Sequence, residues 1–170
     1  MGDVFSVEIL LDPASEANVR NEWARLIEAG LPSAGRQTTP SNRPHITLAV
    51  RERVDASSLA PVAEDLPFDL DLGGMLLFGR RDSFVLTRQV IVSAALLDVH
   101  RRVAAIVGPA ESRYQVTAPD HWTPHVTLAR RMSAGQVAKA LAAVPSHPIS
   151  ARATGLRVWD AAARTVTTLC

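Results

Sequence analysis

His45 and His125 stand in matching sequence surroundings, PHITLA and PHVTLA, at positions 80 residues apart. Thr47 and Thr127 follow them two residues later, and alternation along a strand places each histidine and its threonine on one face. The apolar residues between them point the other way and fix the register, because a one-residue slip would bury the histidine. Imidazole gives or takes a proton near neutral pH, so two imidazoles facing one substrate group would form a general acid and a general base.

The duplication of the motif is what favours catalysis, since a lone histidine on a strand is more often a structural residue. A zinc site is disfavoured because neither motif contains an acidic residue or another histidine to complete a ligand set. We therefore expect no metal and no cofactor. The other histidines are interpreted as solvated or structural: His121 in the loop before the second motif, His100 on a solvated helix face, and His147 in a turn.

Predicted strands and helices recur in the same order around the two motifs. Apolar patterns predict strands over residues 4–11, 44–50, 68–78, 84–92, 149–159 and 165–169, and from residue 124 onward. Capping residues and apolar periodicity predict helices from Asp12-Pro13 to Gly30, over 57–65, over 93–107, and from Ser133 to Val144. Loops are expected before each motif strand, over 31–43 and 110–123.

The offset between corresponding elements is near 80 residues, with first strands near 4 and 84 and first helices near 14 and 94. We interpret this as an internal duplication. It predicts an α+β fold with two pseudo-symmetric lobes of antiparallel strands, outer helices, and a central cleft in which the two motif strands come together. The 170 residues are expected to form a single domain, 1–170, built from halves at about 1–82 and 83–170.

The overall composition is that of an ordinary globular protein, with 47% apolar and 21% charged residues. Its net charge of +1 gives no case for an extended nucleic-acid-binding surface. Cys170 is the only cysteine, which excludes an internal disulfide and a thiolate metal site. The first residues, MGDVF, lack the basic and apolar regions of a secretion signal, and no stretch is long enough for a membrane span. We expect a cytoplasmic monomer without a membrane partner.

The two motifs, HITL from His45 and HVTL from His125, resemble those of the 2H phosphoesterase superfamily. Within it the chain is most similar to the 2′-5′ RNA ligase-like proteins, which include RNA 2′,3′-cyclic phosphodiesterases. The second copy of the motif, PHVTLAR, is the part of the sequence most similar to this group. The first copy departs from the pattern, because Val50-Arg51 stands where RNA cyclic phosphodiesterases usually have a bulky Phe and a Gly.

The resemblance implies a metal-independent hydrolase that opens a 2′,3′-cyclic phosphate at an RNA or nucleotide end. One imidazole would activate water toward phosphorus while the other protonates the departing ribose oxygen. The hydroxyls of Thr47 and Thr127 would bind the non-bridging oxygens. The resemblance assigns proton donation to His45 and proton acceptance to His125, and some members of the family join RNA ends by the reverse reaction.

Three residues beside the motifs are further candidates for substrate binding. Trp122 could stack on a base or pack the loop, and Arg43 could clamp a phosphate or be solvated. Arg130 falls on the buried face by strict alternation, which argues against phosphate contact unless the strand ends or bulges there. Trp23 and Trp159 are interpreted as packing residues.

Two alternative functions stay open at this stage. The substrate could be a small nucleotide such as ADP-ribose 1″,2″-cyclic phosphate, since the modest net charge fits small or terminal substrates better than long RNA. The chain could also be a non-catalytic nucleotide-binding or RNA-binding module, although binding alone does not need two titratable groups.

Overall fold

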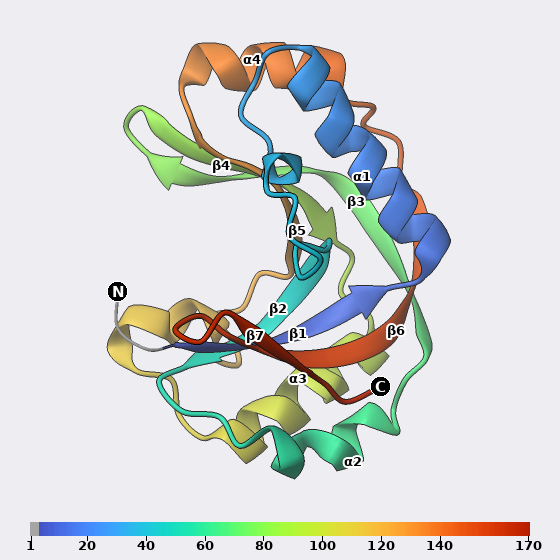
Figure 1. Cartoon of the computed structure of the whole chain (residues 1–170), viewed down its shortest axis with the longest axis vertical. Helices are drawn as coiled ribbons and strands as arrows, with labels where there is room; N and C mark the ends of the chain where they lie inside the picture. The colour runs from blue at the N-terminus through green and yellow to red at the C-terminus, as the bar shows by residue number, and fades with distance from the viewer. Residues whose placement is uncertain (1–3) are drawn as a thin grey trace.

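The computed structural model describes residues 4–170, as a sheet flanked by helices (Figure 1). The strands are β1 Phe5–Leu11, β2 His45–Arg51, β3 Phe68–Arg80, β4 Ser83–Val90, β5 His125–Met132, β6 Ile149–Asp160 and β7 Thr165–Thr168. The helices are α1 Pro13–Glu28, α2 Ala60–Ala63, α3 Ala94–Val107 and α4 Ala134–Ala143, with 3-10 turns at Ala34–Arg36, Ala56–Leu59 and Ser112–Thr117. The predicted order of elements is confirmed, although short 3-10 turns interrupt both predicted loops and the helix expected over 57–65 becomes one 3-10 turn followed by α2.

The helix starts follow from their capping residues. The Asp12 carboxylate accepts the Ser15 backbone N–H at 3.1 Å, and Pro13 occupies the first turn of α1. Ser93 caps α3 through the Leu96 N–H at 3.2 Å. Ser133 begins α4 with a reciprocal capping box, in which its backbone N–H donates to the Gln136 side chain.

The strand order in the sheet is β1-β2-β5-β4-β3-β6-β7, with antiparallel pairing throughout. Since β6 also pairs with β1, the pairings return to their start and form a ring of six strands, with β7 attached to β6. The two motif strands, β2 and β5, are neighbours in this ring. The prediction of an α+β fold in which a central position brings the motif strands together is therefore confirmed.

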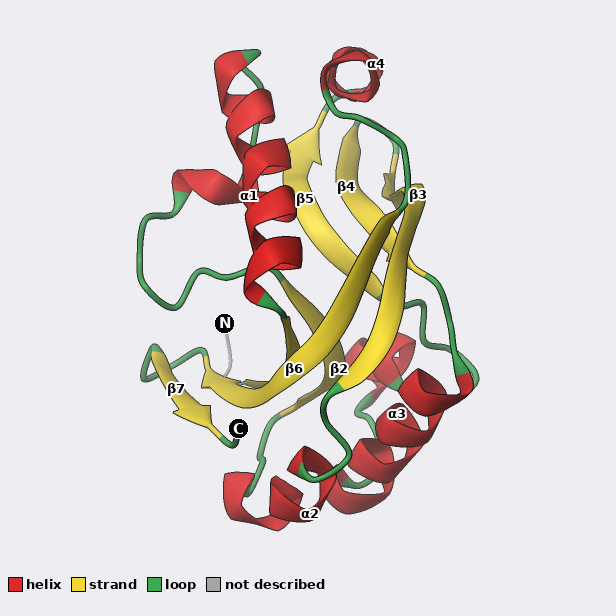
Figure 2. Cartoon of the chain, turned by 90° about the vertical axis from the view of Figure 1, so that its right-hand side faces the viewer, coloured by secondary structure: helices red, strands yellow, loops and turns green. Residues whose placement is uncertain are grey.

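Strands of one sequence half pair with strands of the other half. The first part of β6 pairs with β3, and its last part pairs with β1 of the first half. The last part of β3 pairs with β4 of the second half. Helix α3 packs on β2. Helix α1 packs on β6 and β5, and its neighbour α4 packs on β4 and β5 (Figures 1 and 2). A division of the chain near residue 82 thus describes the sequence repeat and does not describe two separate bodies.

The core confirms the predicted register of the motif strands. Ile46, Leu48, Val126 and Leu128 are fully buried, while the histidines and threonines that alternate with them are partly exposed. This alternation places the four polar side chains on the face that the core leaves open.

Arg88 is a buried cation in the interior. It pairs with the Glu22 carboxylate of α1 and donates to the Gly73 carbonyl at 2.8 Å and the His147 carbonyl at 3.1 Å. These bonds tie α1, β3 and the loop before β6 together.

Candidate active site

The two motifs meet where β2 pairs with β5. Ile46 and Val126 are direct partners in this antiparallel pair. One step further in each direction, the register sets His45 opposite Thr127 and Thr47 opposite His125. All four side chains are partly exposed, on the face opposite the buried apolar set. The structure therefore brings the four predicted residues together, with each histidine facing the threonine of the other motif.

Both imidazoles are held by the same kind of hydrogen bond. Nδ1 of His45 lies 2.7 Å from the Arg43 carbonyl oxygen, and Nδ1 of His125 lies 2.8 Å from the Thr123 carbonyl oxygen. A carbonyl oxygen only accepts hydrogen bonds, so Nδ1 donates in both rings. This fixes the orientation of each ring and leaves Nε2 as the ring nitrogen that no backbone carbonyl binds.

A buried carboxylate lies beside His45. Oε1 of Glu8 is 3.6 Å from Nε2 of His45, beyond the length of a normal hydrogen bond. The Glu8 carboxylate accepts from Arg157 Nε at 2.8 Å and from the Ser6 hydroxyl at 2.5 Å, so its position is fixed. Any positive charge that His45 takes up therefore has a preorganised carboxylate next to it. Sequence analysis missed Glu8, although an acid within the apolar strand VEILL was a usable signal.

His125 has different surroundings. The Phe78 ring packs against its imidazole, with ring centroids 4.7 Å apart and an interplanar angle of 54°. Burial lowers the pKa of His125, the hydrogen bond to Thr123 opposes this change, and the charges of Arg130 and His45 lower the pKa further. The net pKa is below the ordinary histidine value, which favours a neutral ring at neutral pH.

Two tryptophans hold the backbone of the motif threonines. The indole N–H of Trp23 donates to the Thr127 carbonyl at 3.0 Å, and that of Trp122 donates to the Thr47 carbonyl at 2.9 Å. One face of Trp122 stacks on His100, with ring centroids 3.9 Å apart and an angle of 4°. Trp23 packs in the core as predicted, and the contacts of Trp122 support its packing interpretation.

The prediction that His100 is solvated is wrong, because its side chain is buried. His100 follows Leu96 by four residues and precedes Val103 by three, so all three occupy the buried stripe of α3. Its Nε2 donates to the Thr117 carbonyl at 3.0 Å. Burial lowers the pKa of His100, and this hydrogen bond opposes the change.

The two arginines beside the motifs have different surroundings. β5 contains a bulge near its end, where the register with β4 shifts and Arg131 has a φ of 58°. Strict alternation fails there, and Arg130 lines a cavity together with His45 and Thr127. Arg43 instead forms an ion pair with Glu16 at 2.6 Å. Because β5 bulges here, alternation no longer argues against a phosphate contact by Arg130. Arg43, in contrast, already pairs with an acidic side chain.

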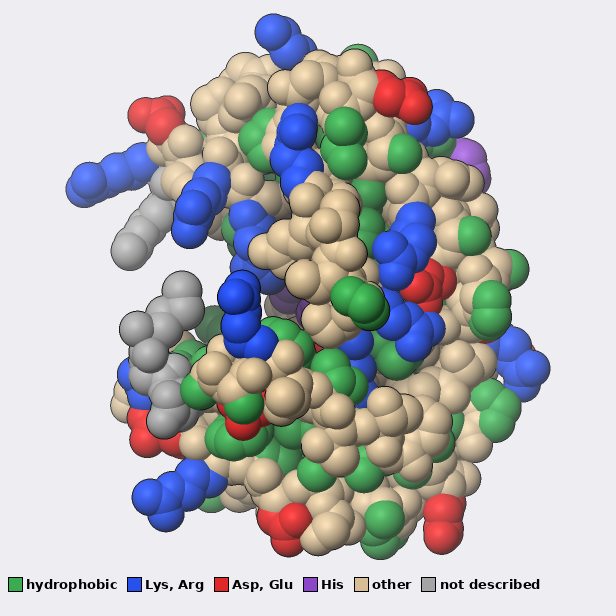
Figure 3. All heavy atoms as spheres, in the orientation of Figure 1, with side chains coloured by type: hydrophobic (Ala, Val, Ile, Leu, Met, Phe, Trp, Pro, Cys, Tyr) green, Lys and Arg blue, Asp and Glu red, His purple; other side chains and the backbone are tan. Residues whose placement is uncertain are grey.

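Two cavities meet at His45. The motif cavity has a volume of about 420 Å³ and is lined by Trp23, Pro44, His45, Thr127, Arg130 and Arg131, among others. The arginine groove has a volume of about 1030 Å³ and includes His45, Arg36, Arg43, Arg157, Trp159 and Arg164. Figure 3 shows Lys and Arg side chains around the hollow of this face, with a histidine visible inside it.

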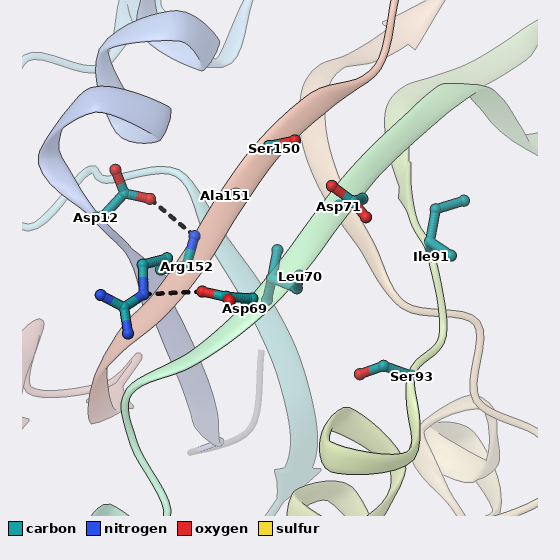
Figure 4. Close-up of a pocket in the computed structure, with 9 residues that line it drawn as sticks. All are labelled: Asp12, Asp69, Leu70, Asp71, Ile91, Ser93, Ser150, Ala151 and Arg152. Carbon is teal, nitrogen blue, oxygen red and sulfur yellow. Dashed lines mark hydrogen bonds and ion pairs between the residues drawn. The ribbon is translucent and has the colours of Figure 1, made fainter.

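A third cavity, of about 460 Å³, lies on β3 and β6 and contains none of the motif residues (Figure 4). Arg152 pairs with Asp69 at 2.9 Å in this cavity, and the Arg152 backbone N–H donates to the Asp12 carboxylate at 2.8 Å. Within residues 4–170 no three His, Cys, Asp or Glu side chains are grouped so that they could share a metal ion. None of the helices in this part of the chain has the length and apolar character needed to cross a membrane.

A ring of antiparallel strands, two of which are neighbours and carry a histidine and a threonine on the same face, defines a duplicated α+β protein. A family model described as the 2′-5′ RNA ligase superfamily matches residues 12–165. The chain belongs to this superfamily of 2H phosphoesterases, which confirms the resemblance seen in the motifs.

Solved structures share the fold over nearly their whole length. TT0787 of Thermus thermophilus is 16% identical, with 98% of this chain and 95% of that chain covered and a TM-score of 0.59. Escherichia coli LigT complexed with 3′-AMP is 21% identical, with coverage of 100% and 97% and a TM-score of 0.59. Kluyveromyces marxianus Usb1 is 10% identical, with coverage of 99% and 98% and a TM-score of 0.52. A comparison with curated protein sequences gives no match.

Proposed function

We propose that this protein is a metal-independent phosphodiesterase that opens a 2′,3′-cyclic phosphate at the end of an RNA or on a nucleotide. The observation that carries the proposal is the pairing of β2 with β5, which places His45 and His125 on one face of neighbouring strands, each opposite the threonine of the other motif. Membership of the 2′-5′ RNA ligase superfamily supports phosphodiester chemistry. The 3′-AMP bound to LigT supports a nucleotide as the ligand.

His125 acts as the general base in this proposal. Its lowered pKa keeps Nε2 unprotonated near neutral pH, so that it can take a proton from water as the water oxygen bonds to phosphorus. His45 acts as the general acid: Nε2 gives its proton to the ribose oxygen as the bond between that oxygen and phosphorus breaks. The negative charge of the Glu8 carboxylate lies beside the His45 ring while the ring holds the proton that it gives to the ribose oxygen. The roles implied by the motif resemblance are thus retained.

The threonine hydroxyls bind the phosphate. Thr47 and Thr127 lie on the same face as the imidazoles and donate to the non-bridging oxygens, where negative charge grows in the transition state. Because both threonines are on strands of the ring, the donors are positioned before the substrate arrives. Arg130 lies at the edge of the motif cavity and adds a positive charge near the same oxygens.

The test is hydrolysis of a short RNA ending in a 2′,3′-cyclic phosphate, with EDTA present and the product assigned as a 2′- or 3′-phosphate. Turnover in chelator supports the proposal. Incubation of the cyclic-phosphate RNA with a 5′-hydroxyl RNA tests ligation, in which the 5′-oxygen bonds to phosphorus in place of water and one ribose oxygen leaves. Absence of turnover on this RNA, on a cyclic mononucleotide and on ADP-ribose 1″,2″-cyclic phosphate would contradict the proposal and favour a non-catalytic nucleotide-binding module. Cytoplasmic location and a monomeric state stay predictions.

A further inference from the structure

The face of the sheet that carries His45 continues away from the motif cavity. His45 pairs with Leu10 of β1, and Glu8 of the same strand pairs with Arg157 of β6. Cross-strand partners lie on the same face of an antiparallel sheet. Trp159, two residues after Arg157, therefore lies on this face as well. The face leads without interruption from the imidazole of His45 to the indole of Trp159.

This face is one wall of the arginine groove. The neighbouring strand β7 extends this face with Val166, which pairs with Trp159, and Thr168, which pairs with Arg157. Residues 36–43 of the loop before β2 also line the groove. His45 lines both the arginine groove and the motif cavity. A ligand whose reactive phosphate lies at His45 can therefore extend into the groove.

The charges of the groove suit an anion. Its lining contains four arginines and one acidic residue, Glu8. Arg157 is paired with Glu8, and Arg43 is paired with Glu16. Among the described residues 4–170, no carboxylate forms an ion pair with Arg36 or Arg164. Arg36 donates one hydrogen bond to the Leu31 carbonyl at 3.0 Å. The other N–H groups of Arg36, and the guanidinium group of Arg164, can donate to a phosphate, which arginine binds through paired N–H donors.

Trp159 adds a surface for a base. Its side chain is partly exposed and lines the groove, unlike the buried Trp23. An accessible aromatic ring in a groove lined by cations is the combination that single-stranded nucleic-acid sites use, because bases stack on aromatic rings without regard to sequence.

We propose that the arginine groove binds the phosphate on the 5′-oxygen of the ribose that carries the cyclic phosphate. The groove also binds the nucleoside attached to the other side of that 5′-phosphate. The inference rests on the proposed function. Arg164 and Arg36 contact this second phosphate, and Trp159 stacks on the attached base. Two ligands share this chemistry: an RNA end, through its last phosphodiester, and ADP-ribose 1″,2″-cyclic phosphate, through its diphosphate.

The experiment compares kcat/KM for adenosine 2′,3′-cyclic phosphate, its 5′-phosphorylated form, and the dinucleotide ApA with a 2′,3′-cyclic end. The 5′-phosphate is expected to raise kcat/KM about tenfold or more through a lower KM, as a hydrogen-bonded charge pair does. In Arg164→Ala this advantage falls to about twofold or less, and the salt dependence of kcat/KM becomes shallower. Trp159→Ala reduces the further advantage of ApA. Arg53→Ala is the matched control, because Arg53 is an exposed arginine outside both cavities.

ADP-ribose 1″,2″-cyclic phosphate, assayed beside ApA, shows which of the two sources the groove prefers. Equal kcat/KM for all adenosine substrates in the parent would overturn the groove proposal and leave the proposed function intact. If none is hydrolysed, the proposed function fails, and calorimetric binding of adenosine 2′-phosphate and adenosine 2′,5′-bisphosphate decides the inference separately. Tighter bisphosphate binding that Arg164→Ala abolishes supports it, and equal binding of the two nucleotides overturns it.

Discussion

The indole of Trp23 holds the backbone of Thr127 through a 3.0 Å hydrogen bond from Nε1 to the carbonyl oxygen. Trp122 makes the same bond to Thr47 at 2.9 Å. Trp23 belongs to α1 in the first sequence half, and Trp122 precedes β5 in the second. Each motif threonine is therefore held by the half of the chain that does not contain it, which couples the geometry of the two motifs.

Replacement of either tryptophan by phenylalanine keeps an aromatic ring and removes the N–H donor. We expect Trp23→Phe and Trp122→Phe to lower kcat about tenfold, since small displacements of positioned groups are costly, with KM little changed. The unpaired carbonyl is expected to cost about 1–3 kcal/mol of unfolding free energy. Steady-state kinetics and urea denaturation separate the two effects. Lower stability at an unchanged kcat would show that the bonds only support the fold.

Removal of the motif hydroxyls tests phosphate binding directly. Thr47→Val and Thr127→Val keep the shape of the side chain and are expected to lower kcat/KM about 10- to 100-fold, the range for one hydrogen bond to a charged group. Thr154→Val is the control, because Thr154 is an exposed threonine on β6. Equal behaviour of all three variants in the hydrolysis assay would mean that the motif hydroxyls do not contact the phosphate.

The pH dependence of kcat/KM follows from the lowered pKa of His125. As general base it must be neutral, so activity is expected to fall only as the pH drops below the ordinary histidine value of about 6.5. Arg130 lowers this pKa through its charge, so Arg130→Gln is expected to move the acidic limb to higher pH. Profiles of parent and variant between pH 4 and 8 check the direction. A shift to lower pH would contradict the assignment of His125 as the base.

Buried His100 predicts how stability depends on pH. Burial lowers its pKa in the folded state, so below about pH 6.5 the unfolded chain binds the proton more readily. Stability is expected to be complete above pH 6.5 and to decline as the pH falls toward the lowered folded-state value. His100→Gln keeps a donor for the Thr117 carbonyl and removes the titration. Thermal unfolding at pH 7.5 and 5.5 should show a smaller loss in this variant, and an equal loss would refute the argument.

The local sequence predicts much of this fold because capping residues and alternation act over short distances. Asp12, Ser93 and Ser133 begin helices as expected, and the strict alternation around His45 and His125 placed both motifs correctly. The repeat predicted that the two motif strands come together, and the structure adds that β2 and β5 pair directly.

Capping residues and alternation do not predict contacts between residues far apart in the sequence. The acceptors of the Trp23 and Trp122 indoles are backbone carbonyls 104 and 75 residues away in the chain, and carbonyls carry no sequence signal. The side of β5 on which Arg130 lies depends on a bulge that strict alternation does not predict. His100 is different: its spacing from Leu96 and Val103 identified a buried position, and the neighbouring arginines misled the interpretation.

The most direct test of the two-histidine mechanism compares the parent with His45→Ala, His125→Ala and His147→Ala on an RNA ending in a 2′,3′-cyclic phosphate, in EDTA. His147 is an exposed histidine outside the two cavities that meet at His45, so His147→Ala is expected to match the parent. Each of the other two variants is expected to lose about 10²- to 10⁴-fold in kcat, the contribution of one general acid or base. Parent-like turnover in either His45→Ala or His125→Ala would contradict the mechanism.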